Sequence, residues 1–195
     1  MKVCIISNSH PTNDVRLRYK LGQSLAQKGE VYIISTNGMV NNNVNPFQEV
    51  VDATSPLKAL PLIYRQAAIH KPDLVICVEP LTLLVGMILR KRFGAKLIFD
   101  SHEFFADAHA ERSSLLLRPF VKVLYLKLLR FLARRADSVW AVNQEILNQL
   151  FPRNPRGKRY LVLPNYPVAN VWDYQCDIPG SLAQLCDMRF DLVYA

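Results

Sequence analysis

The chain has 195 residues, of which 50% are hydrophobic, 21% charged and 10% aromatic, a composition that excludes a disordered or fibrous protein. This length leaves room for one full domain and little more. Lysine and arginine outnumber aspartate and glutamate by 24 to 16, and the net charge of +8 permits an anionic partner without identifying one. No apolar run approaches the roughly 20 residues of a membrane-crossing helix. The sequence opens on a strand-like segment, so we expect no secretory signal. Its 4 cysteines show no C-x-x-C spacing, and two of them lie inside apolar strand candidates, so we expect reduced, buried thiols and a cytoplasmic location.

Short apolar runs rich in β-branched residues alternate along the chain with longer helical segments. Strands are expected at residues 2–7, 31–36, 48–53, 74–79, 96–100, 138–142 and 160–163. Helices are expected at residues 15–28, 56–69, 80–93, 113–135 and 144–151, with a polar loop at 37–45. The segment 74–78 is continuously apolar, which is typical of a strand covered on both faces. The alternation predicts an α/β fold: a doubly wound, mostly parallel, Rossmann-like sheet with helices on both faces.

The chain changes character near its end. We expect residues 1–167 to form the Rossmann-like domain, and residues 168–195 to form a linker and the start of a further domain. Residues 168–188 have weak periodicity, and the run at 191–195 reads as the beginning of another strand. We therefore expect either a domain cut from a longer protein or one subunit of a split protein.

Ligands of open parallel sheets bind beyond the carboxyl ends of the strands, so the residues that follow each strand are candidate site residues. The loop after the first strand carries Ser9, His10 and Asp14 and lacks the G-x-G-x-x-G fingerprint of a dinucleotide site. Its hydroxyl, imidazole and carboxylate groups suit a polyhydroxylated ligand, with capping of the next helix by Asp14 as the alternative. Glu79 follows a later strand, where it either caps a helix or contacts a sugar hydroxyl.

Four polar residues in a row, 100–103, follow the apolar run at 97–99. They cannot all face an apolar core, because uncompensated burial costs several kcal/mol. His102 could carry a proton or donate a hydrogen bond to a phosphate, and Asp100 or Glu103 could act as a general base. A purely structural histidine is the alternative. We expect no metal site, because the 4 histidines have no ligand spacing on a common helix.

The segment 112–135 contains seven basic residues and no acidic one. Helical periodicity gathers one broad apolar face that we expect to pack on the core: Phe120, Val121, Leu124, Tyr125, Leu128, Phe131 and Leu132. The opposite face mixes apolar residues with cations: Lys122, Lys127, Arg130 and Arg134. Such a face indicates a helix lying on anionic lipid, with a solvated helix back as the alternative. Nucleic acid is disfavoured because the aromatic residues lie on the expected buried face.

Several short motifs, in this order, resemble the N-terminal domain of glycosyltransferase family four, whose retaining enzymes have two facing Rossmann-like domains in the GT-B fold. The motifs are Ser9-His10-Pro11 with Asp14 and Arg16, then residues 24–31, 71–75, 99–103, 136–143 and 163–165. Together they span nearly the whole chain, and the order is that of the family.

The resemblance implies the acceptor-binding half of a hexosyltransferase that needs no metal or other cofactor. A C-terminal domain, in the same chain or in a partner, would bind the nucleotide-sugar, so the isolated chain is expected to be inactive. The resemblance places on His102 the histidine that positions the reacting sugar, and on Ser9, His10 and Asp14 the loop that borders the inter-domain cleft. With the candidates read from the strand ends, the expected catalytic residues are His102, Asp100 and Glu103. The expected acceptor-binding residues are Ser9, His10, Asp14, Arg16 and Glu79. The implied membrane contacts are Lys122, Lys127, Arg130 and Arg134.

The acceptor is then expected to be a sugar or a lipid-linked sugar, used to build a surface polysaccharide or glycolipid at the inner face of the cytoplasmic membrane. The alternative, from a different class, is a non-catalytic module that recruits the partner subunit of a split glycosyltransferase to that membrane. A self-sufficient nucleotide-binding protein is a third, weaker hypothesis, because the glycine fingerprint is missing.

Overall fold

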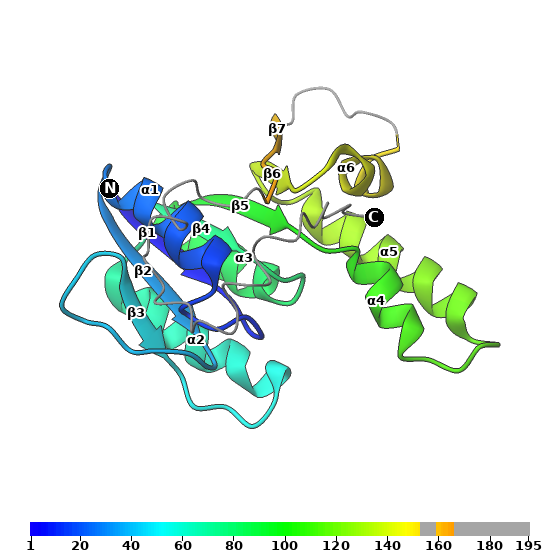
Figure 1. The fold of residues 1–195 in the computed structure, drawn as a ribbon, viewed down its shortest axis with the longest axis horizontal. Helices are drawn as coiled ribbons and strands as arrows, with labels where there is room; N and C mark the ends of the chain where they lie inside the picture. The colour runs from blue at the N-terminus through cyan, green and yellow to red at the C-terminus, as the bar shows by residue number, and fades with distance from the viewer. Residues whose placement is uncertain (153–158, 166–195) are drawn as a thin grey trace, which may run out of the picture. The chain divides into compact units, whose positions relative to one another are not determined.

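The computed structural model describes residues 1–152 and 159–165, and Met1–Asn165 form one compact unit (Figure 1). The linker and the strand expected within 168–195 lie outside the described residues. No helix in the described part of the chain combines the length and the apolar character needed to cross a membrane.

The described residues form a seven-stranded sheet in the order β3-β2-β1-β4-β5-β6-β7. The strands are β1 (Lys2–Ile6), β2 (Glu30–Ser35), β3 (Phe47–Val50), β4 (Leu74–Cys77), β5 (Lys96–Ser101), β6 (Ser138–Ala141) and β7 (Arg159–Val162). Every neighbouring pair is parallel. The predicted Rossmann-like α/β fold is confirmed. The chain order reverses on either side of β1, which lies between β2 and β4, and ligands of such sheets bind at this kind of reversal.

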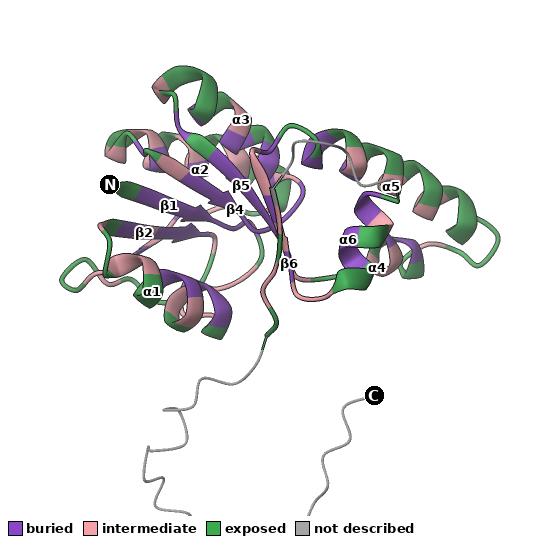
Figure 2. Ribbon diagram, turned by 90° about the horizontal axis from the view of Figure 1, so that it is seen from above, coloured by how far each residue is buried: buried purple, intermediate pink, exposed green. Residues whose placement is uncertain are grey.

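Helices connect the strands and cover both faces of the sheet (Figure 2). They are η1 (Val15–Gly22), α1 (Gln23–Ala26), α2 (Pro56–His70), α3 (Thr82–Phe93), α4 (Phe105–Glu111), α5 (Arg118–Ala133) and α6 (Gln144–Leu150). The segment expected to be one α-helix at 15–28 begins instead with a π-helix, η1. The short helix α4 is not predicted from the sequence, and α5 starts five residues later than expected, at Arg118.

Two buried clusters stabilise the sheet, one on each face. Val3 and Ile5 of β1 pack with Leu17 of η1 on one face. Cys4 and Ile6 belong to the larger cluster on the other face, which is completed by α2, α3, α5 and α6. Because side chains alternate along a strand, a continuously apolar run such as β1 is buried on both faces at once.

One prediction about packing is wrong. Four members of the face of α5 that was expected to be buried are exposed: Phe120, Leu124, Leu128 and Phe131. The buried residues of α5 lie in its last turns, at Leu129, Leu132 and Ala133, and Tyr125 packs against the core while partly buried. The reason is geometric: α5 packs mainly against α4, and the two helices extend away from the sheet as a hairpin (Figure 1).

Candidate functional site

The predicted site residues come together where β1, β4 and β5 end. The loop after β1 supplies residues 7–14, the turn after β4 supplies Glu79, and the end of β5 and the residues after it supply residues 100–103. The structure divides them into three groups with different environments: a carboxylate that holds the first loop, a buried ion pair, and a histidine pair beside a cavity.

Glu79 holds the first loop in place. Its Oε1 accepts hydrogen bonds from the hydroxyls of Ser7 at 2.6 Å and Ser9 at 2.8 Å and from the backbone N–H of His10 at 3.3 Å. Its Oε2 accepts from the backbone N–H of Asn8 at 3.0 Å. Glu79 is 5% exposed, and it does not cap α3, where the N-cap is Leu81 with no side-chain hydrogen bond. Both oxygens are therefore used to hold the loop: Oε1 orients Ser9 and His10, and Oε2 holds Asn8.

Arg16 and Asp100 form a buried, bidentate ion pair. Arg16 Nε lies 2.7 Å from Asp100 Oδ2, and Nη2 lies 2.6 Å from Oδ1. A third nitrogen of Arg16, Nη1, donates to the carbonyl of Leu163 at 3.1 Å. Arg16 is 5% exposed and Asp100 is fully buried. The pair ties η1 to β5 and to the segment after β7, and neither charge is presented to solvent for a ligand to reach.

His10 and His102 form a hydrogen-bonded pair although they lie 92 residues apart in the sequence. Their Nε2 atoms are 2.9 Å apart, and the two rings meet edge to face. One ring must therefore donate and the other accept. The interaction with the Asp14 carboxylate, whose Oδ2 lies 3.8 Å from Nδ1, raises the pKa of His10 above its usual range. Burial lowers the pKa of His102. These opposite shifts favour a protonated His10 that donates to a neutral His102.

Asp14 has two partners at once. It caps η1 by accepting the backbone N–H groups of Arg16 at 2.8 Å and Leu17 at 3.1 Å, so the capping alternative is observed. It also faces His10, and that interaction is the main reason why the pKa of Asp14 is lowered. A carboxylate at this position therefore fixes both the start of the helix and the charge of the imidazole.

Glu103 lies at the edge of the histidine pair, exposed, with Oε1 3.9 Å from Nε2 of His10. Among the described residues, the ligand atoms of His10, His102 and Glu103 lie within 4.8 Å of one another and could hold a metal ion. Two imidazoles on one tetrahedral zinc ion have nitrogens about 3.3 Å apart. The observed 2.9 Å is the separation of a hydrogen bond, so the two rings would have to move apart to admit an ion.

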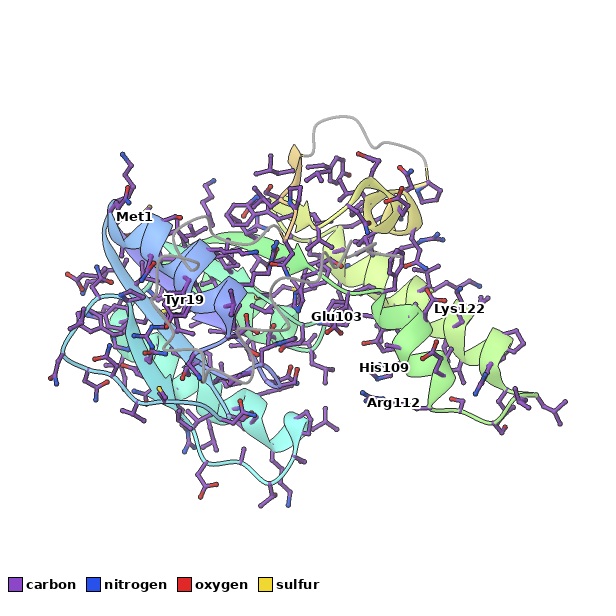
Figure 3. The ribbon with its side chains drawn as sticks, in the orientation of Figure 1. Met1, Tyr19, Glu103, His109, Arg112 and Lys122 are labelled. Atoms are coloured by element: carbon purple, nitrogen blue, oxygen red, sulfur yellow. The ribbon has the colours of Figure 1, made fainter. Side chains whose placement is uncertain are left out.

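A cavity of about 230 Å³ opens beside this pair, between the strand ends and the α4–α5 hairpin. Asn8, Ser9, Glu79 and Glu103 line its sheet side. The hairpin side is lined by Phe105, Ala108, His109, Arg112 and Tyr125, and Figure 3 shows His109 and Arg112 extending from the end of α4 toward the body of the sheet. Sequence reasoning missed this second wall. The only sequence feature that pointed to the hairpin side of the cavity was that Arg112 begins the basic segment 112–135.

The four cations predicted to contact a membrane fall into two pairs. Lys122 forms an ion pair with Asp107 of α4, and Arg130 donates to the carbonyl of Gln149 at 2.9 and 2.7 Å, so both fasten α5 to its neighbours. Lys127 and Arg134 are exposed. The sequence also missed an exposed strip, which we name the apolar hairpin surface: Leu115, Leu116, Leu117, Phe120, Leu124, Leu128 and Phe131.

Comparison with known proteins points to one class of enzyme. Residues 38–166 match the family described as glycosyl transferase 4-like domain. Similar solved structures include a sucrose-phosphate synthase from Thermosynechococcus elongatus, with 17% identity and a TM-score of 0.61 over 97% of this chain and 53% of that one. HepE of Anabaena in complex with UDP-glucose has 16% identity and a TM-score of 0.62 over 96% of this chain and 49% of that one.

A third similar structure is the lipopolysaccharide outer core galactosyltransferase WaaB, with 14% identity and a TM-score of 0.52 over 86% of this chain and 46% of that one. At these identities the structures show a shared fold. The chain spans about half the length of each of these three proteins. No curated protein sequence matches it.

Proposed function

Because this chain belongs to the glycosyl transferase 4-like family and is a glycosyltransferase domain, we propose that it binds the acceptor in a sugar-transfer reaction. The nucleotide-sugar would be bound mainly by a second domain, in the same chain or in a partner. The observation that carries the proposal is the cavity lined by Ser9, Glu79 and Glu103 beside the His10–His102 pair. Carboxylates, hydroxyls and imidazoles at one end of a small cavity suit the hydroxyl groups of a sugar.

In the proposed reaction, an acceptor hydroxyl oxygen bonds to the anomeric carbon of a hexose and the bond from that carbon to the nucleotide diphosphate breaks. The hydroxyl proton passes to the departing diphosphate oxygen, and the configuration at carbon is retained. The carboxylate of Glu103 would accept hydrogen bonds from sugar hydroxyls, and neutral His102 would steady the site by accepting the Nε2–H of His10. Protonated His10 would place a positive charge next to the reacting groups. Glu79, Asp14 and the Arg16–Asp100 pair would position these residues without touching the substrate.

We also propose that the α4–α5 hairpin rests on an anionic membrane surface at the cytoplasmic face. The support is the apolar hairpin surface, on which Leu116 is 92% and Phe120 68% exposed, together with the nearby exposed cations Lys127 and Arg134. Large apolar side chains gathered on one surface of a soluble domain mark an interaction site, and cations beside them favour anionic lipid. The acceptor would then be lipid-linked and would reach the cavity from the membrane.

The acceptor site is tested by amide NMR on this chain, titrated with decyl glucoside below its micelle concentration. We expect binding with millimolar affinity, seen as amide chemical-shift changes confined to the loops around Ser9 and His102. These changes should be absent in the His102→Ala variant. The matched control is His70→Ala, whose imidazole contacts Glu49 of the edge strand β3 at 3.0 Å and does not line the cavity, and it should keep the shifts. Micromolar binding of UDP, GDP, ADP or NAD by the chain alone would refute the acceptor-half proposal.

The same hairpin favours the second candidate, a non-catalytic module that recruits a partner subunit to the membrane. Such a module would tolerate loss of His10, Asp14 and His102 but would fail when Lys127 and Arg134 are neutralised. Glycoside shifts that survive His102→Ala, with vesicle binding intact, would favour this alternative.

A further inference from the structure

Arg112 lines the cavity, and its guanidinium has no hydrogen-bond or ion-pair partner among the described residues. Three other cations on η1 and the α4–α5 hairpin are engaged: Arg16 by Asp100, Lys122 by Asp107, and Arg118 by the carbonyls of Ser113 and Glu111. Arg112 is also exposed. A guanidinium in this setting is available to a ligand, and its planar fork matches a phosphate or carboxylate.

His109 stands beside Arg112 on the same wall. Its ring stacks on Tyr125, with the ring centroids 4.2 Å apart and an interplanar angle of 24°. Burial, followed by the charge of Arg112, lowers the pKa of His109. The imidazole is therefore neutral at neutral pH and has an N–H to donate. An anion bound here would pair with Arg112 and favour protonation of His109, so both groups would respond to the same ligand.

The cavity is polarised along its length. Its sheet side carries Glu79 and Glu103, whose charges repel an anion, and Glu103 is exposed and can accept hydrogen bonds from sugar hydroxyls. Its hairpin side carries Arg112 and His109. Three residues after Arg112 the exposed leucines 115–117 begin the apolar hairpin surface. From the sheet outward, the order is thus Glu103, which suits sugar hydroxyls, then Arg112 and His109, which suit an anion, and then the apolar leucines 115–117.

We propose that Arg112 and His109 form a phosphate subsite, and that the acceptor is a sugar joined through a phosphodiester to a lipid. The inference rests on the proposed function, since it assigns the sheet side of the cavity to the acceptor sugar. In this arrangement the sugar lies beside Glu103, its phosphate lies on Arg112, and the lipid chain leaves along the hairpin. An uncharged glycolipid would leave Arg112 unused.

Three probes test the subsite on this chain by calorimetry, each below its micelle concentration: decyl glucoside, decyl phosphate, and glucose joined to a decyl chain by a phosphodiester. We expect the phosphodiester to bind at least tenfold more tightly than either of the others. Arg112→Gln should bring its affinity down to that of decyl glucoside. Arg118→Gln is the matched control, since this arginine lies on the same hairpin outside the cavity, and it should keep the tenfold gain.

A second readout is the pKa of His109, followed by NMR, which should rise with the phosphodiester and not with decyl glucoside. The inference is overturned if decyl glucoside and the phosphodiester bind equally, or if the tenfold gain in affinity of the phosphodiester survives Arg112→Gln. It is also overturned if decyl phosphate binds as tightly as the phosphodiester. In the last case Arg112 would recognise any lipid phosphate, whether or not it carries a sugar. The proposed function fails by a different result, in which neither decyl glucoside nor the phosphodiester changes the amide chemical shifts of Ser9 and His102.

Discussion

Asp100→Asn is the most direct test of how the site is held together. The substitution keeps the shape of the side chain and removes the charge that neutralises Arg16. Because Arg16 is only 5% exposed, its guanidinium would remain buried without a counter-ion. Breaking a buried ion pair in this way costs about 3–5 kcal/mol, a large share of the roughly 5–15 kcal/mol that stabilises an ordinary domain.

The matched control is Asp137→Asn. Asp137 pairs with Arg90 at 3.1 Å, but the two side chains are 29% and 45% exposed, and such pairs contribute about 1 kcal/mol or less. Urea unfolding of both variants, followed by circular dichroism, compares the two losses directly. A third variant, Arg16→Met with Asp100→Leu, removes both buried charges and should recover much of the stability lost by Asp100→Asn.

The reasoning is refuted if Asp100→Asn costs no more than Asp137→Asn. It is also refuted if the double variant is less stable than Asp100→Asn, because the pair itself, rather than the unpaired charge, would then supply the stability.

Three further predictions follow from the site and the hairpin. Asp14→Asn should lower the pKa of His10 toward its unfolded value of about 6.5, measured by NMR of the imidazole. Because the fold raises the pKa of His10, protonation of this imidazole stabilises the folded state. That contribution is fully present below about pH 6.5 and is lost as the pH rises through the folded pKa. Leu116→Asp should reduce binding to phosphatidylglycerol vesicles, measured by sedimentation, at least tenfold, since burying one leucine contributes about 1.5–3 kcal/mol. The control is Val40→Asp, at an exposed apolar residue of the loop after β2, which should leave sedimentation with vesicles unchanged. Glu79→Gln replaces one acceptor oxygen by a donor facing other donors, so urea unfolding should show a loss of about 1–3 kcal/mol, and a neutral result would contradict the role of Glu79 in holding the loop.

Local sequence was sufficient for most of the fold. The continuous apolar run of β4 indicated burial on both faces, and each strand pairs in the parallel arrangement that this pattern predicts. Asp14 as a helix cap followed from the same local chemistry. Both inferences depend on residues within a few positions of one another.

Predictions that depended on distant residues were less successful. The apolar face of α5 has the periodicity of a buried helix, but burial requires something to cover it, and α5 extends past the edge of the sheet. The contact between His10 and His102 joins residues 92 apart, which no spacing along the chain reveals. The orientation of Glu79 toward the first loop, rather than toward its own helix, depends on donors more than 65 residues away, such as the backbone N–H of Asn8.

The buried charges near the site act on it through position. The Oδ2 atom of Asp100 lies 3.9 Å from Nδ1 of His102, a separation too long for a hydrogen bond, and both of its oxygens already accept from Arg16. Nδ1 of His102 is itself buried and has no hydrogen-bond partner among the described residues. Protonating His102 would therefore place a charge where only a distant, already paired carboxylate could offset it, which agrees with the lowered pKa of this imidazole. Burial, the largest cause of this lowered pKa, outweighs the charge of Asp100, which raises it. We therefore propose that Arg16 and Asp100, for which the sequence suggests direct contact with substrate, act on the site by holding η1 against the end of β5.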